Sequence, residues 1–176
     1  MKKLFWIISL SLLFVSLAFA QTPRFAKYQI GETGYFSYFP GDPGKFEVQK
    51  TEDDLLLYLG ETEVQACKYG LIMVLFENKL AGSGKKELLD LLIAYLDYLK
   101  TSFEITESAG YGKGHTMESN PEAQGVIDYW ENVEGIKFVV KGWIDKNALC
   151  FLYISGKEEP NYNYQSLFLN GFRFKE

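Results

Sequence analysis

One long amphipathic segment, residues 85–103, constrains the fold of this chain more than any other feature. In KKELLDLLIAYLDYLKTSF, apolar side chains recur with the spacing of one face of a helix. That face consists of Leu88, Leu92, Tyr95, Leu96, Leu99 and Phe103. The segment therefore predicts a helix that packs its apolar stripe against the core of the protein.

Short strand-like runs precede this helix. Residues 35–39 form an aromatic run that should end at Pro40, because proline lacks a backbone N–H and fixes φ. The sequence PGDPG that begins at Pro40 predicts consecutive turns. Further extended runs are residues 46–48, 55–59 and 64–76.

The part of the chain after the helix predicts a meander of three strands. These strands should cover residues 126–131, 136–145 and 149–155. The turns between them fall near Gly135 and Asn147, residue types that tolerate the positive φ of tight hairpins.

A second, short helix is expected close to the C-terminus. Pro160 suits its first turn, and Gly171 suits the position just after its last turn. Together these elements predict an α+β fold, in which an antiparallel sheet of about six strands, ending in the meander, carries helices on its faces.

The first twenty residues have the pattern of a secretory signal peptide. Lys2 and Lys3 precede an apolar run, and Ala18-Phe19-Ala20 forms a small-x-small cleavage site before Gln21. The alternative is an uncleaved anchor, but the apolar run is short for a membrane span, which needs about 20 apolar residues. We therefore expect an exported protein, periplasmic or extracellular, with no stable membrane span after cleavage.

The remainder of the chain predicts one domain. Residues 21–34 are polar without a clear period and are expected to form an N-terminal tail, and residues 35–176 a single domain. The net charge of −5 argues against nucleic acid as a partner.

The two cysteines, Cys67 and Cys150, allow two interpretations. An oxidising compartment permits a Cys67–Cys150 disulfide. Both residues lie in or beside apolar runs, however, and free cysteine is among the most buried residue types. We favour two buried thiols.

Motifs for catalysis or metal binding are absent from the sequence. His115 is the only histidine, and no pattern typical of zinc or calcium ligands occurs. The glycines at 110–114 lack the strand and helix context of a dinucleotide site and are expected to form a flexible turn. A nucleophile–base pair would need the fold to bring a cysteine to His115. We expect no cofactor, no metal and no enzymatic activity.

The meander supplies a candidate binding surface. If Glu134 and Gly135 form a two-residue loop, then Trp130, Lys141 and Trp143 share one face of the sheet. Tryptophan is enriched at interfaces, so this face is a candidate contact for a partner or ligand. The alternative is that the C-terminal helix covers it.

Two residues of the glycine-rich stretch are added to these candidate binding residues. They are Tyr111 and His115.

Several short motifs resemble the PsbP-like superfamily. The first combines Phe36, Phe39, Pro40, Gly41 and Pro43. The stretch GYGKGHTME is similar to the family's glycine-rich turn into a strand, and FLNGFRF is similar to its C-terminal ending, although Asn170-Gly171 replaces the usual polar-Ser pair. The family includes exported bacterial proteins of the DcrB and LpqN kinds and the Ran-binding factor Mog.

The resemblance implies an α/β/α sandwich but supplies no catalytic residues. It implies a non-enzymatic binding or assembly module, whose partner would be another envelope or secreted protein. The alternatives are a carrier of an apolar small ligand and a hydrolase without a recognisable motif.

Overall fold

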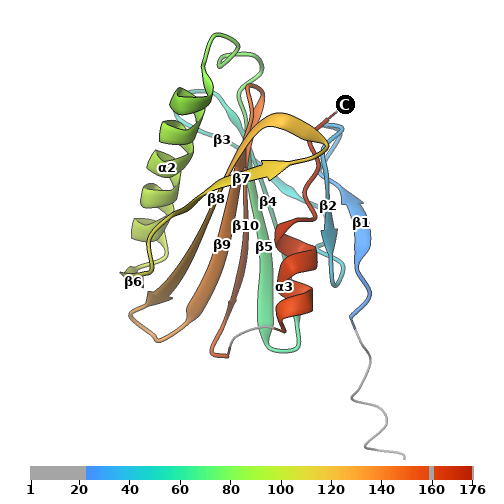
Figure 1. The fold of residues 1–176 in the computed structure, drawn as a ribbon. Helices are drawn as coiled ribbons and strands as arrows, with labels where there is room; N and C mark the ends of the chain where they lie inside the picture. Colours follow the sequence, from blue (N-terminus) through green and yellow to red (C-terminus); the bar gives the residue numbers. More distant parts are fainter. Residues whose placement is uncertain (1–22, 159–160, 176) are drawn as a thin grey trace, which may run out of the picture.

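The computed structural model describes residues 23–158 and 161–175 (Figure 1). The predicted signal peptide and Pro160 lie outside these ranges. In chain order the elements are β1 Ala26–Gln29, β2 Phe36–Phe39, β3 Glu47–Lys50, β4 Leu56–Val64, β5 Cys67–Leu75, α2 Lys85–Ser102, β6 Ile105–Ser108, β7 Gly112–Met117, β8 Asn120–Asn132, β9 Lys137–Ile144, β10 Ala148–Gly156 and α3 Tyr162–Leu169. The predicted α+β class is confirmed, with more strands than the sequence indicated.

Eight of the strands form one antiparallel sheet. Its order is β3-β4-β5-β10-β9-β8-β6, and β7 pairs with another part of β8. The predicted meander is confirmed as β8, β9 and β10. The pairing of β10 with β5 joins the two halves of the chain into one sheet, while β1 and β2 form a separate hairpin.

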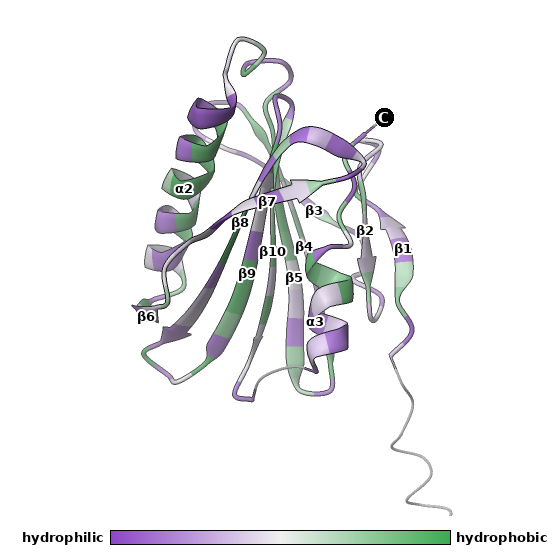
Figure 2. Ribbon diagram, viewed as in Figure 1, coloured by the Kyte–Doolittle hydropathy of each residue, from purple (hydrophilic) through white to green (hydrophobic). Residues whose placement is uncertain are grey.

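Each face of this sheet is covered by a different layer. α2 lies on one face, called the α2 face here, and α3 with the β1–β2 hairpin lies on the other, called the α3 face (Figure 1). Leu88, Leu92, Leu96 and Leu99 of the predicted stripe are buried. Figure 2 shows the apolar side of α2 turned toward the sheet and its polar side turned away. Within the described ranges, no helix is long and apolar enough to cross a membrane.

The PGDPG corner is a structural feature of the α3 face. β2 ends at Phe39, as Pro40 predicts, and both residues are buried. The Phe39 ring meets Phe168 of α3 edge-on, with ring centroids 5.0 Å apart. The aromatic run therefore anchors the β1–β2 hairpin and α3 to the same core.

The β8–β9 hairpin differs from the prediction by one residue. The loop contains Val133 as well as Glu134 and Gly135, so Trp130 pairs with Phe138, whereas the two-residue loop would have placed Val139 opposite it. Gly135 takes the left-handed conformation, with φ of 71°, which suits the last position of a three-residue loop. A shift of one residue moves every side chain of a strand to the other face. The prediction of which side chains share a face of this hairpin is therefore wrong.

Two smaller expectations also need correction. Ala26–Gln29 is strand β1, paired with β2, so the predicted tail belongs to the domain from that point. Asn147 does not adopt positive φ, because the Asp145 carboxylate accepts hydrogen bonds from the N–H groups of Asn147 and Ala148 and shapes the turn itself.

The second helix begins slightly later than predicted. Asn161 is its N-cap, and its side chain accepts a hydrogen bond from the N–H of Asn163 at 2.9 Å. The N–H of Gly171 bonds to the carbonyl of Phe168 at the C-terminal end, in agreement with the predicted stop.

Candidate functional site

A cleft lies on the α2 face where the helix stops short of the strand ends. α2 ends at Ser102, whereas β5, β9 and β10 extend below it (Figure 1). The cleft has a volume of about 650 Å³, within the range of small-molecule sites, roughly 300–1,000 Å³. Its lining is Glu61, Glu63, Gln65, Ala66, Cys67, Lys68, Phe103, Asn132, Glu134, Ile136, Phe138, Tyr153, Ser155, Gly156, Lys157 and Glu158.

Three aromatic rings form the apolar part of the cleft. Phe103 stacks on Phe138 with ring centroids 5.4 Å apart, and the Tyr153 ring lies 5.3 Å from Phe103. Gly70, which pairs with Tyr153 across the strands, makes room for that ring, since a Cβ at Gly70 would lie 2.0 Å from it. The Tyr153 hydroxyl donates a hydrogen bond to Glu61 at 2.7 Å. Burial and this carboxylate raise the pKa of Tyr153, which stays a hydrogen-bond donor at neutral pH.

The rim of the cleft is mainly acidic. Glu61 pairs with Lys68 at 3.2 Å. Glu63, Glu134 and Glu158 have no ion pair with any described residue. Carboxylates outnumber ammonium groups around the cleft, so its potential favours a cationic partner.

Ser155 supplies an unusual polar group to the cleft. The residue is 6% exposed, and its hydroxyl has no hydrogen-bond partner among the residues that the structure describes. Buried hydroxyls normally find a partner in the protein or in water. The hydroxyl of Ser155 is thus available to a molecule in the cleft.

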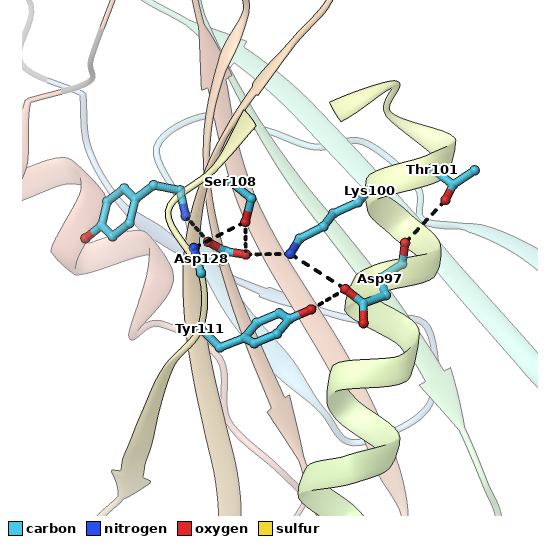
Figure 3. Close-up of polar contacts among 8 residues, drawn as sticks. Asp97, Lys100, Thr101, Ser108, Tyr111 and Asp128 are labelled. Atoms are coloured by element: carbon cyan, nitrogen blue, oxygen red, sulfur yellow. Dashed lines mark hydrogen bonds and ion pairs between the residues drawn. The ribbon is translucent and has the colours of Figure 1, made fainter. Parts of the chain in front are cut away.

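A polar network, buried at Asp128, connects α2 to the sheet (Figure 3). Lys100 lies 2.9 Å from the carboxylate of Asp128, which is fully buried. That carboxylate also accepts hydrogen bonds from the Ser108 hydroxyl and the Tyr129 N–H, each at 2.8 Å. The network therefore links the C-terminal half of α2 to β6 and β8, and so positions Phe103.

These donors control the ionisation of Asp128. Burial alone would raise the pKa of Asp128, but Trp130, Lys100, Ser108 and the Tyr129 N–H together hold it below its ordinary value. The indole N–H of Trp130 is close enough to contribute, although it makes no hydrogen bond of normal geometry to a described residue. Asp128 is therefore a stable anion with a structural role.

Tyr111 belongs to the same network. Its hydroxyl donates to the carboxylate of Asp97, and its ring lies under Lys100, with the ammonium 4.3 Å from the ring centroid. The pKa of Lys100 is raised because hydrogen bonds to Asp128 and Tyr111 outweigh its burial. Both charges of the pair are stabilised, so neither is poised for acid–base chemistry.

The predicted Trp130/Lys141/Trp143 surface is not present. Trp130 lies on the α2 face and is 3% exposed, whereas Trp143 lies on the α3 face and is 2% exposed. The Trp143 indole N–H donates to the carbonyl of Leu169 at 3.3 Å, so α3 covers this residue. The prediction fails because the hairpin register differs by one residue and because both indoles are core residues.

Lys141, Trp143 and His115 do gather on the α3 face. The Lys141 ammonium lies 4.6 Å from the centroid of the Trp143 ring and 2.6 Å from the side-chain oxygen of Asn170. Burial lowers the pKa of Lys141 to about 8, and burial with the nearby Lys141 lowers the pKa of His115. No carboxylate of the described residues forms an ion pair with Lys141.

The position of Lys141 has a structural explanation. Asn170 caps the C-terminal end of α3, where a positive charge interacts favourably with the helix dipole. The predicted turn at 110–114 is only partly present, because strand β7 begins at Gly112 and contains His115, although Gly110 and Gly114 do take positive φ.

The cysteines are free and buried, as favoured from the sequence. Cys150 pairs with Met73, which lies about 20 Å along β5 from Cys67 at the usual rise per residue. A disulfide needs Cα atoms about 4.4–6.8 Å apart, so the alternative of a Cys67–Cys150 bond is wrong. Burial raises the pKa of both thiols, and Glu158 and Glu63 raise that of Cys67 further.

No cysteine meets His115 either. Cys150, Trp143, Gly125 and His115 form one row across four neighbouring strands. Three strand spacings separate its ends, which is about 14 Å. The pairing of a thiol with His115 that a cysteine nucleophile would need is therefore not formed.

The sequence could not locate the cleft. Tyr153 and Glu61 are far apart in the chain, and only strand pairing brings them together. Among the residues with described positions, no cluster of histidine, cysteine or carboxylate side chains is suited to hold a metal ion. The chain matches no protein-family model and no curated protein.

Proposed function

We propose that this protein is an exported, non-enzymatic binding or assembly module with a PsbP-like α/β/α sandwich, and that the cleft is its binding site. The observation that carries the proposal is the cleft itself. It combines an aromatic floor, an acidic rim and the unpartnered hydroxyl of Ser155. Such a mixture of apolar contact area and a few placed polar groups is typical of recognition sites.

The fold supports the family part of the proposal. An antiparallel sheet carries a helix on each face, which is the arrangement that the PsbP-like resemblance implies. Phe36 and Phe39 of the opening motif are the first and last residues of β2, and Pro40 begins the corner that follows.

The chemistry of the cleft favours binding over catalysis. Its described lining contains no histidine, and its cysteine, Cys67, has a raised pKa. Glu61 is engaged by both Tyr153 and Lys68. The residues therefore provide contacts and charge, without an activated nucleophile beside a base.

A carrier of an apolar ligand fits less well. Such a ligand needs a site enclosed by apolar side chains, whereas four carboxylates and two lysines surround this cleft. The acidic rim also disfavours nucleic acid. The signal-peptide pattern supports a partner outside the cytoplasm, either an envelope protein or a secreted one.

Site-directed photo-crosslinking in the native envelope tests the proposal. A benzophenone amino acid is placed at Ile136, in the cleft, and in a control protein at Tyr98, which is exposed on the outer side of α2. We expect one discrete crosslinked product from position 136 and none from position 98. Equal products from both positions, or none from either, would overturn the assignment of the cleft.

A further inference from the structure

The sheet has an open edge beside the cleft. β3 pairs with β4 only at residues 56–59, but β4 continues to Val64. Before β3 the chain does not pair with β4, and the Phe46 ring lies over Gly60, where an added Cβ would be 2.3 Å from it. Along residues 60–64, β4 has no outer strand neighbour among the described residues.

The main-chain groups that face this edge can be assigned. The N–H of Thr51 donates to the carbonyl of Leu55 at 2.9 Å, so Leu55 turns its main-chain groups toward the outer side. The direction of the main-chain groups repeats every second residue of a strand. The N–H and C=O groups of Glu61 and Glu63 therefore also point toward the outer side of β4. Each of these residues therefore presents an N–H and a C=O to the open edge.

The side chains of the same two residues lie on the α2 face. Glu61 pairs with Gly70 and Glu63 with Lys68, beside the aromatic rings of the cleft. In an antiparallel pairing between two copies of this edge centred on Thr62, Glu61 would lie opposite Glu63. Like charges directly opposite each other destabilise a strand pair. Pairing of this edge with the same edge of a second copy is thus unfavourable, whereas pairing with a strand that carries basic side chains is favourable.

We propose that this edge binds an extended, basic segment of a partner protein by antiparallel strand addition. Lysine or arginine residues at alternating positions lie opposite Glu61 and Glu63, and the one opposite Glu61 extends toward the ring of Tyr153, which lies over Gly70 on the neighbouring strand. Main-chain hydrogen bonds supply affinity, while the alternating side chains supply specificity. Contact between a cation and an aromatic ring adds to the attraction.

The residue between the two basic positions is small. It lies on the α3 face opposite Thr62, where Gly41 closely approaches Thr62 and Val64. The inferred motif is therefore basic-small-basic. This inference rests on the proposed function, because it names the partner chemistry for the same cleft.

Peptide binding to the intact mature protein tests the inference. The probe is a fluorescein-labelled peptide, Val-Lys-Ser-Lys-Val-Thr, acetylated and amidated at its ends, and its affinity is measured by anisotropy. We expect binding that weakens at least tenfold for the double variant Glu61→Gln/Glu63→Gln. The control variant Glu52→Gln, exposed in a turn away from the edge, should bind as the wild type does.

Modified peptides separate strand addition from simple charge attraction without altering the protein. N-methylation of both lysine amides removes the N–H groups that would bond to β4 and should abolish binding. N-methylation of the serine amide, which faces away from β4, should have little effect. Equal effects of the two modifications, or equal binding of a peptide with glutamate in place of lysine, would overturn strand addition. If either of these results is obtained but Ile136 still crosslinks to a partner, the cleft remains the binding site. Only the proposal of a basic, extended segment as the partner is then rejected.

Discussion

Lys141 shows how one buried charge influences stability. It is 6% exposed, and burial lowers its pKa from 10.5 to about 8. The folded protein therefore releases this proton at lower pH than the unfolded chain. Between about pH 8 and 10.5 the unfolded state binds more protons, so the contribution of Lys141 to stability rises with pH. At pH 7 the cost of keeping the charge buried is fully present.

We predict that Lys141→Met stabilises the protein at neutral pH. The gain should be at most about 3 kcal/mol in the free energy of unfolding, from the size of the pKa shift. Urea denaturation at pH 7 and at pH 9.5 measures it, and the difference from wild type should shrink at the higher pH. Lys146→Met, at an exposed position, is the control. A Lys141→Met protein less stable than wild type at pH 7 would contradict this account.

Gly70 is required by the ring of Tyr153. We predict that Gly70→Ala destabilises the protein by about 1–3 kcal/mol, because its Cβ would overlap that ring. Urea denaturation measures the change, and Gly82→Ala, where a Cβ meets nothing within 4 Å, is the control. In a Tyr153→Ala background the cost of Gly70→Ala should largely disappear. A cost that persists there would show that the ring is not the cause.

At the scale of elements, α2 depends on the buried pair of Lys100 and Asp128. We predict that Asp128→Asn lowers the free energy of unfolding by about 3–5 kcal/mol at pH 7, because Lys100 loses its buried counter-ion and keeps only the more exposed carboxylate of Asp97, 3.6 Å away. Thermal and urea denaturation measure the loss. Asp90→Asn, which breaks an exposed pair on the same helix, should cost less than about 1 kcal/mol.

The pH dependence of Asp128 provides a further check on this prediction. The pKa of Asp128 is lowered in the folded state, so its contribution is present above the unfolded pKa and is lost as pH falls through the folded one. The difference in the free energy of unfolding between Asp128→Asn and wild type should therefore become smaller at acidic pH. A difference that stays constant down to pH 2 would contradict the assigned role.

Prediction from sequence succeeded for elements whose signal is local. The stripe of Leu88, Leu92, Leu96 and Leu99 identifies α2, since burial of one helical face depends on residues within the segment itself. Pro40 likewise identifies the end of β2.

The features missed from sequence depend on turns without a distinctive residue. Gly135 suits a two-residue and a three-residue loop alike, so the register of β8 and β9 was open to an error of one residue. The β4–β5 hairpin turns at Gln65 and Ala66, both with positive φ, although neither residue type indicates it. That hairpin forms one side of the cleft, which is why the site was not predicted.

At the scale of the whole molecule, one sheet separates two cores and leaves two features uncovered. α2 is shorter than the strands that it covers, which produces the cleft. β3 is shorter than β4, which produces the open edge. The two features meet at Glu61 and Glu63, so a partner that uses one can use the other.

The central claim is that the cleft binds a partner, and Ser155 tests it most directly. Its hydroxyl has no partner in the described structure, so Ser155→Ala should leave the melting temperature unchanged or slightly higher. Ser37→Ala is the matched control, because Ser37 is also buried and unpartnered but lies in β2, outside the lining of the cleft.

The measurement is the yield of the crosslink from Ile136 in each serine variant, made alongside the melting temperature. We predict that Ser155→Ala lowers the yield at least fivefold while Ser37→Ala leaves it at the wild-type level, with both proteins fully folded. An unchanged yield in Ser155→Ala, or equal losses in both variants, would contradict the assignment of this cleft as the binding site.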